Sequence, residues 1–194
     1  FFGKYHDCYV SFLSEGVTHQ KAIIIEIWAL ISAALAIAAF ISWMMLNIHI
    51  LALFLITVMY NLKPFVLKDK TFGSLIANTL MGTFAFAFGW YAVEQSFFLF
   101  IEKSLPYIFF NTSLYFLTTI PDAEGDKHAH KKTICVVYGV RSTIYWAFGF
   151  EIIAVILAGI MMDWLILIPS ALTLPFYVKL LMSNNVSSSI LTIK

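Results

Sequence analysis

The sequence predicts an all-α, polytopic integral membrane protein built as a bundle of helices. Of its 194 residues, 61% are hydrophobic and only 12% are charged, and the mean hydropathy is +0.87. A soluble domain of this length does not have such a composition. The apolar residues gather in segments whose lengths suit membrane helices, at 22–44, 47–61, 72–93, 104–120, 142–161 and 163–182.

These segments differ in length, and the stretches between them carry most of the charge. A helix needs about 20 apolar residues to cross the hydrocarbon core of a bilayer, so the second and fourth segments are short. Residues 94–103 are expected to lie at the membrane interface, because charged residues flank their short apolar centre. Phe1 is not an initiator methionine, and the residues after Met182 indicate a turn toward a further helix. The sequence therefore predicts one transmembrane domain over residues 1–194 that is incomplete at both ends.

Positive charge is distributed unevenly between the two ends of these helices. If all six segments span the membrane, the N-terminus, the loops 62–71 and 121–141 and the C-terminal tail share one side. Every lysine and arginine except Lys103 falls on that side: Lys4, Lys21, Lys63, Lys68, Lys70, Lys127, Lys131, Lys132, Arg141, Lys179 and Lys194. We therefore expect both loops to be cytoplasmic. The net charge of +1, without a basic run interleaved with aromatics, predicts no nucleic-acid partner.

The longest polar run of the chain, Thr118–Gly139, brings acidic residues, lysines and histidines together between apolar segments. If the chain is helical after Pro121, Asp122 and Asp126 share one face at positions i and i+4, and Glu124 points away from it. Two carboxylates suit Mg²⁺, which completes its octahedral shell with phosphate oxygens and waters. The alternative is a solvated loop between two membrane helices, in which mixed charge has no chemical role.

Basic side chains directly follow these carboxylates. Lys127, Lys131 and Lys132 could hold a diphosphate as point charges, and the imidazoles of His128 and His130 could donate hydrogen bonds to it. A zinc site is less expected, since no third soft ligand lies nearby in the sequence. Spacing alone therefore leaves both a metal–diphosphate site and a solvated loop open.

The same run resembles the second aspartate-rich motif of the UbiA superfamily of intramembrane prenyltransferases, which is close to D-x-P-D-x-E-G-D-x-x-A-G-x-x-T-x-x-V-x-x-G. The positions in register are Pro121, Asp122, Glu124, Gly125, Asp126, Ala129, Thr133, Val136 and Gly139. The segment from Tyr60 to Lys68, YNLKPFVLK, is similar to the Y-S-x-P-P-x-x-L-K loop of the family. The resemblance covers the chain from about Leu13 onward.

The chain departs from the family pattern in several places. Thr119 stands where many members carry an acidic residue, and His130 stands where glycine is usual. The first aspartate motif of the family, N-x-x-x-D-x-x-x-D, is not found in the chain. Residues 13–18 resemble the segment that follows that motif, so the motif is expected before Phe1.

The resemblance implies a nine-helix intramembrane enzyme, of which this chain would supply about six helices. It implies that Asp122 and Asp126 bind Mg²⁺, and that these aspartates and Lys68 are the catalytic residues. Lys68, Lys127 and Lys132 would bind the diphosphate of an isoprenoid diphosphate. The enzyme would transfer the prenyl group to an apolar acceptor, which is aromatic, lipid or pigment, within the lipid bilayer.

Two other classes of function stay open. A catalytically inactive UbiA-like homologue would act as a structural or cofactor-holding subunit, with other subunits of a larger membrane complex as partners. Loss of the first motif from the whole protein would favour this class. A transporter would show an internal repeat or interrupted helices at the membrane midplane, and neither is clear in the sequence.

Glu151 lies near the middle of an apolar segment. A carboxylate is costly there, and a functional role is the first hypothesis for it. Because Glu151 matches no motif of the resembling family, we favour a structural pairing or a protonated carboxyl.

Overall fold

The computed structural model describes residues 27–33, 36, 43–94 and 96–182. Its helical elements are α3 (Trp43–Leu53), the π-helical η1 (Phe54–Met59), the short η2 (Leu67–Asp69), α4 (Thr71–Tyr91), α5 (Phe97–His128), α6 (Ile134–Ile160) and α7 (Trp164–Met182). Residues 27–33 are also helical, and the described ranges contain no strand. The prediction of an all-α fold is confirmed.

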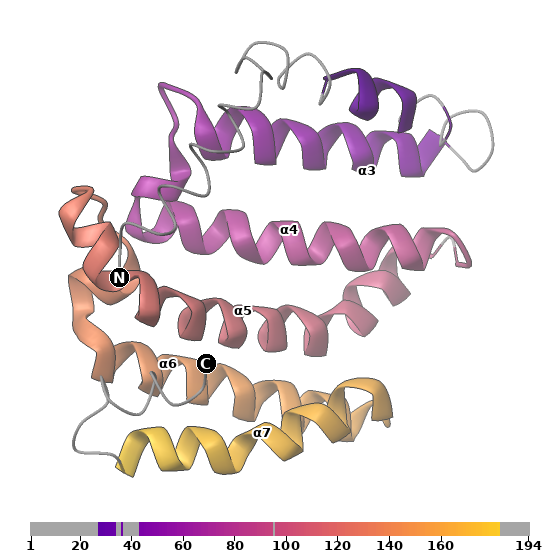
Figure 1. Ribbon diagram of the computed structural model, residues 1–194. Coiled ribbons are helices and arrows are strands. Elements are labelled where there is room, and N and C mark those ends of the chain that lie inside the picture. Colours follow the sequence, from indigo (N-terminus) through magenta and orange to yellow (C-terminus); the bar gives the residue numbers. More distant parts are fainter. Residues whose placement is uncertain (1–26, 34–35, 37–42, 95, 183–194) are drawn as a thin grey trace. The chain divides into compact units, whose positions relative to one another are not determined.

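The chain forms two compact units, Phe1–Asn47 and Ile48–Lys194. In the second unit, α4, α5, α6 and α7 are successive neighbours, and each packs against the next (Figure 1). Short connections reverse the chain between them. As a result, α5 ends and α6 begins at the end of the bundle where α4 begins (Figure 1).

The membrane character of the fold is confirmed by its longest apolar helices. α4, α6 and α7 are long and apolar enough to cross a membrane, and Trp43–Met59 is a shorter apolar helix. α4, α6 and α7 correspond to the predicted segments 72–93, 142–161 and 163–182, and the shorter helix corresponds to the segment 47–61. The chain is therefore a polytopic membrane protein. The predicted segment 22–44 lies mainly outside the described residues.

Helix α5 differs from the prediction at both ends. The fourth apolar segment was predicted over 104–120, and its bounds were wrong, because α5 begins at Phe97 and so includes much of the stretch 94–103. Ser96 starts this helix, since its backbone is extended and its side chain accepts a backbone hydrogen bond from the first turn. The helix also continues past Pro121 to His128, so the first part of the predicted polar loop is helical. Proline removes one backbone donor, but its fixed φ is compatible with a helix.

The core between α5, α6 and α7 combines apolar clusters with buried hydroxyl groups. The clustered buried residues are Phe116, Ile134, Ala147 and Tyr177 in one group and Ile120, Cys135, Ile144 and Leu180 in another. Ser113 donates a hydrogen bond to the Ala147 carbonyl at 2.7 Å, and its hydroxyl lies 2.6 Å from that of Tyr177. Because lipid is as apolar as these side chains, packing and interhelical hydrogen bonds hold membrane helices together.

Polar side chains also join α4 to α5. Hydrogen bonds connect Tyr115 with Ser74 at 2.7 Å, Thr79 with Thr112 at 3.0 Å, and Asn111 with the Asn78 carbonyl at 3.2 Å. A Cβ atom on Gly82 would collide with the side-chain amide of Asn111. Glycine at position 82 therefore allows the close approach of the two helices on which these bonds depend.

Glu151 is fully buried between α6 and α7. Its Oε1 accepts a hydrogen bond from the Thr173 hydroxyl at 2.9 Å, and the same hydroxyl lies 2.8 Å from the Ser170 carbonyl oxygen. Its Oε2 has no hydrogen-bond partner among the described residues. The structural pairing favoured for Glu151 is thus present, and it links two neighbouring helices.

Candidate functional site

Two loops lie side by side at one end of the bundle, residues 62–70 before α4 and residues 129–133 between α5 and α6 (Figure 1). The Lys132 amide donates a hydrogen bond to the Asp69 carbonyl at 3.0 Å, and the Thr71 hydroxyl donates one to the Lys132 carbonyl at 2.5 Å. The backbone N–H and carbonyl of Lys132 are therefore both hydrogen-bonded to residues at the beginning of α4, Asp69 just before the helix and Thr71 as its first residue. The loops were expected at the same end of the bundle, and they are in direct contact.

The last turns of α5 carry Asp122 and Asp126. Because α5 is helical to His128, the two aspartates lie one turn apart on a shared face, and Glu124 lies off that face. Asp122 is exposed, whereas the side chain of Asp126 is only 13% exposed. Asp126 is thus the aspartate that the surrounding loop partly covers.

Lys131 folds back onto Asp126. Its Nζ lies 3.0 Å from Asp126 Oδ1, and its backbone amide donates a hydrogen bond to the Asp126 carbonyl at 2.9 Å. The side-chain hydrogen bond raises the pKa of Lys131 above its ordinary value, although partial burial acts in the opposite direction. The negative charge of Asp69 also raises this pKa. The ammonium group of Lys131 therefore pairs directly with Asp126 in α5, and Asp69 in the neighbouring loop acts on it through its charge.

The other lysines predicted to bind a diphosphate hold different positions. Lys68 lies in η2, and its Nζ is 3.3 Å from Asn61 Oδ1. Lys127 in the last turn of α5 and Lys132 in the following loop are both exposed. Among the described residues, Lys131 alone forms an ion pair with Asp126. The loop that holds Lys68 contacts the loop that follows the aspartates. The ammonium group of Lys68 itself makes its hydrogen bond to Asn61.

Residues with positive φ angles turn the chain at this end of the bundle, among them Val66, with φ of 40°, directly before η2. His130, with φ of 56°, turns the chain between α5 and α6, and Gly139, with φ of 81°, divides α6 into a short and a long helical piece. A left-handed conformation costs a residue with a side chain about 1–2 kcal/mol, which explains why glycine is usual at the position of His130 in the resembling motif. The turn at His130 is what allows Lys131 to reach back to Asp126.

The donor set fits part of a Mg²⁺ coordination shell. Asp122 and Asp126 supply hard oxygen atoms from one helix face, and Mg²⁺ commonly takes one or two carboxylates together with phosphate oxygens and waters. The described part of the chain holds no group of three or more histidine, cysteine, aspartate or glutamate side chains that could bind a metal ion. These residues therefore suit a metal ion shared with a bound phosphate, and they do not form a cage made of protein ligands alone.

Comparison with known proteins agrees with the motif and with the helical architecture. The sequence matches the UbiA prenyltransferase family over residues 12–188. The chain belongs to the UbiA prenyltransferase family. No curated protein and no solved structure matches it. The UbiA match includes α4 to α7 and both of the contacting loops.

Sequence reasoning on this UbiA chain did not distinguish Lys131 from the lysines beside it, and it did not assign Asp69 to the site. Lys131 stands among three lysines that the spacing does not distinguish, and its contact with Asp126 depends on the turn at His130. Asp69 matches no part of the quoted motifs, and it enters the site through the hydrogen bond between its carbonyl and the Lys132 amide. Its position directly after Lys68 was the only indication in the sequence that Asp69 belongs to the site.

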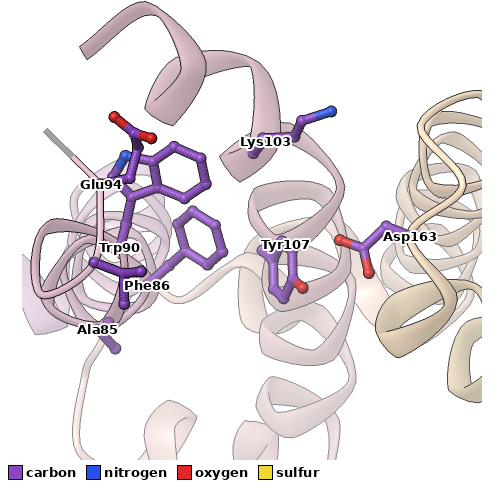
Figure 2. Close-up of a pocket in the computed structure, with 9 residues that line it drawn as sticks. Ala85, Phe86, Trp90, Glu94, Lys103, Tyr107 and Asp163 are labelled. Carbon is purple, nitrogen blue, oxygen red and sulfur yellow. The ribbon is translucent and has the colours of Figure 1, made fainter. Parts of the chain in front are cut away.

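A separate pocket of about 620 Å³ lies at the opposite end of this UbiA bundle (Figure 2). Phe86 and Tyr107 form part of its wall, with ring centroids 4.4 Å apart, and Trp90 lies beside them. The Tyr107 hydroxyl points toward the Asp163 carboxylate (Figure 2). The lining residues do not include the aspartates of α5 or Lys68, so this pocket is distinct from the candidate diphosphate site.

Proposed function

We propose that this UbiA-family protein binds an isoprenoid diphosphate and transfers its prenyl group to an apolar acceptor. The observation that carries the proposal is the hydrogen-bonded contact between the loop that holds Lys68 and the loop that follows Asp126. This contact brings a carboxylate pair suited to Mg²⁺ into one framework with lysines suited to phosphate. Membership of the family supports prenyl transfer as the reaction.

In this proposal each polar residue has a separate task. Asp122 and Asp126 hold Mg²⁺, which when bound offsets the negative charge that develops on the leaving diphosphate. Lys68 binds the diphosphate from the neighbouring loop, where Asn61 orients its ammonium group. Lys127 and Lys132 add positive charge from exposed positions, and charge placed in advance around a leaving group favours its departure.

A non-catalytic UbiA homologue that serves as a subunit of a larger membrane complex is the second candidate. It is favoured by one observation, since the described residues supply a single carboxylate pair and no third potential ligand. Clamping a diphosphate leaving group between two metal ions requires a further acidic cluster across the cavity. The two candidates differ in whether a bound prenyl diphosphate is turned over.

The variant Lys68→Met tests the proposed diphosphate site. Binding of a prenyl diphosphate in the presence of Mg²⁺ should weaken about tenfold, because the variant loses one charge-assisted contact. The measurement is the ligand-dependent rise in the unfolding temperature of the purified protein. Lys103→Met, which removes the same charge at the opposite end of the bundle, should bind as the wild type does. If the wild type shows no Mg²⁺-dependent stabilisation by the ligand, the proposed function is wrong.

We also propose that the end of the bundle that carries Asp126 faces the cytoplasm. Among the described residues this end holds all basic side chains except Lys103: Lys63, Lys68, Lys70, Lys127, Lys131, Lys132, Arg141 and Lys179. Lysine and arginine accumulate on the cytoplasmic side of membrane proteins. A cysteine at position 127 in an otherwise cysteine-free chain should react with a membrane-impermeant reagent only after the cells are opened. Labelling in intact cells would reverse this orientation.

A further inference from the structure

The ion pair between Lys131 and Asp126 occupies a carboxylate that the proposed function assigns to a metal ion. Nζ of Lys131 lies 3.0 Å from Asp126 Oδ1. The aspartate side chain is 13% exposed and the lysine side chain 35% exposed. A cation that arrives from solution therefore meets a carboxylate that is already neutralised and partly covered.

The lysine reaches this position from a backbone fixed at three points. Its own amide bonds to the Asp126 carbonyl, and the Lys132 amide and carbonyl bond to Asp69 and Thr71. An exposed lysine normally loses much of an ion pair's energy through the freedom of its side chain. Here the anchored backbone lowers that loss, so the contact is a built feature of the loop.

Asp69 is a second carboxylate close to Lys131 in the structure. Asp69 Oδ1 is buried and has no hydrogen-bond partner among the described residues. The hydrogen bond from the Lys132 amide to the Asp69 carbonyl places this residue next to the Lys131 backbone. A buried acceptor without a donor is costly, so a cation that comes within reach of Asp69 is stabilised there.

We propose that Lys131 is an exchangeable counter-ion that pairs with Asp126 in the metal-free protein and turns to Asp69 when a divalent metal ion binds Asp126. The inference rests on the proposed function, because it takes Asp126 to be a metal ligand. It assigns Lys131 and Asp69 as positioning residues that set how tightly the site holds its metal before any diphosphate arrives. In this exchange Asp126 is paired with Lys131 when no metal ion is bound, and Lys131 is paired with Asp69 when a metal ion is bound.

Titration of the purified protein with Mn²⁺ without diphosphate, followed by electron paramagnetic resonance, tests this exchange, since Mn²⁺ prefers the same oxygen ligands as Mg²⁺. Lys131→Met should bind Mn²⁺ about fivefold more tightly, because no ammonium group competes for Asp126. Lys131→Gln should behave likewise and guards against a folding defect particular to methionine. Lys63→Met, which removes the same charge from an exposed position in the loop before α4, should change the affinity by about twofold at most.

Asp69→Asn provides the second arm. It should weaken Mn²⁺ binding about threefold when Lys131 is present and leave it unchanged in the Lys131→Met background, since two residues that act on one another give non-additive effects. Unchanged or weaker binding by both Lys131 variants would overturn the exchange while leaving the metal site in place. If instead Asp126→Ala binds Mn²⁺ as the wild type does, Asp126 is not a ligand, and the proposed function fails together with this inference.

Discussion

Asp126→Ala is expected to lower the affinity of the purified protein for a prenyl diphosphate 100-fold or more in the presence of Mg²⁺. The proposed site draws its protein ligands from Asp122 and Asp126 alone among the described residues, so one truncation removes half of the carboxylates. Groups that act as a unit lose most of their effect when one member is removed, and effects of about 10²-fold or more are typical of such sets. Equilibrium binding of a radiolabelled prenyl diphosphate measures the loss.

Glu124→Ala is the matched control for this change. It removes the same charge from the same stretch of α5, but Glu124 lies off the face shared by Asp122 and Asp126. The control should bind the ligand with an affinity within about threefold of the wild type. A change of that size reflects only the general electrostatic effect of removing one charge. Equal losses in Asp126→Ala and Glu124→Ala would show that the aspartates act only through net charge.

Glu151→Ala should destabilise the helix bundle by about 2 kcal/mol or more, because it empties a fully buried position and removes the acceptor of the Thr173 hydroxyl. The loss should appear as a lower unfolding temperature of the purified protein in detergent. Binding of prenyl diphosphate by the fraction that stays folded should be unchanged.

Glu151→Gln separates a structural role of this residue from a functional one. The amide has nearly the same shape, and its oxygen can accept the Thr173 hydrogen bond, so most of the stability should be retained. Glu151→Asp, in contrast, shortens the side chain and should lose the contact across the helix interface. If Glu151→Gln folds as the wild type does but no longer binds the ligand, the structural interpretation of Glu151 is wrong.

The helical membrane fold could be predicted from the sequence because its main signal is composition. Long apolar segments between charged stretches have few alternatives in a bilayer. α4 and α7 lie close to their predicted bounds, whereas α6 begins at Ile134, before its predicted start at position 142. The bounds of α5 could not be predicted equally well. A single cap at Ser96 and a proline at position 121 are weak local signals, and packing against α4 and α6 decides where this helix runs.

The aspartates of the candidate site could be predicted from the sequence, but the ion pair between Lys131 and Asp126 could not. Helical spacing places Asp122 and Asp126 on one face as soon as the helix is known to pass Pro121. The contact of Lys131 with Asp126 depends on the left-handed residue between α5 and α6 and on hydrogen bonds to a loop some sixty residues earlier in the chain. Such long-range contacts leave no periodic trace in a sequence.

Turnover of a prenyl diphosphate by the full-length protein tests prenyl transfer most directly. The measurement is the release of inorganic diphosphate and the appearance of label in an apolar product, from an isoprenoid diphosphate labelled in its prenyl group, with Mg²⁺ and a set of apolar phenolic and alcohol acceptors. We expect release and transfer that require Mg²⁺ and are lost in Asp126→Ala. Tight, Mg²⁺-dependent binding without any release of diphosphate would contradict prenyl transfer and identify the protein as a non-catalytic member of the UbiA family.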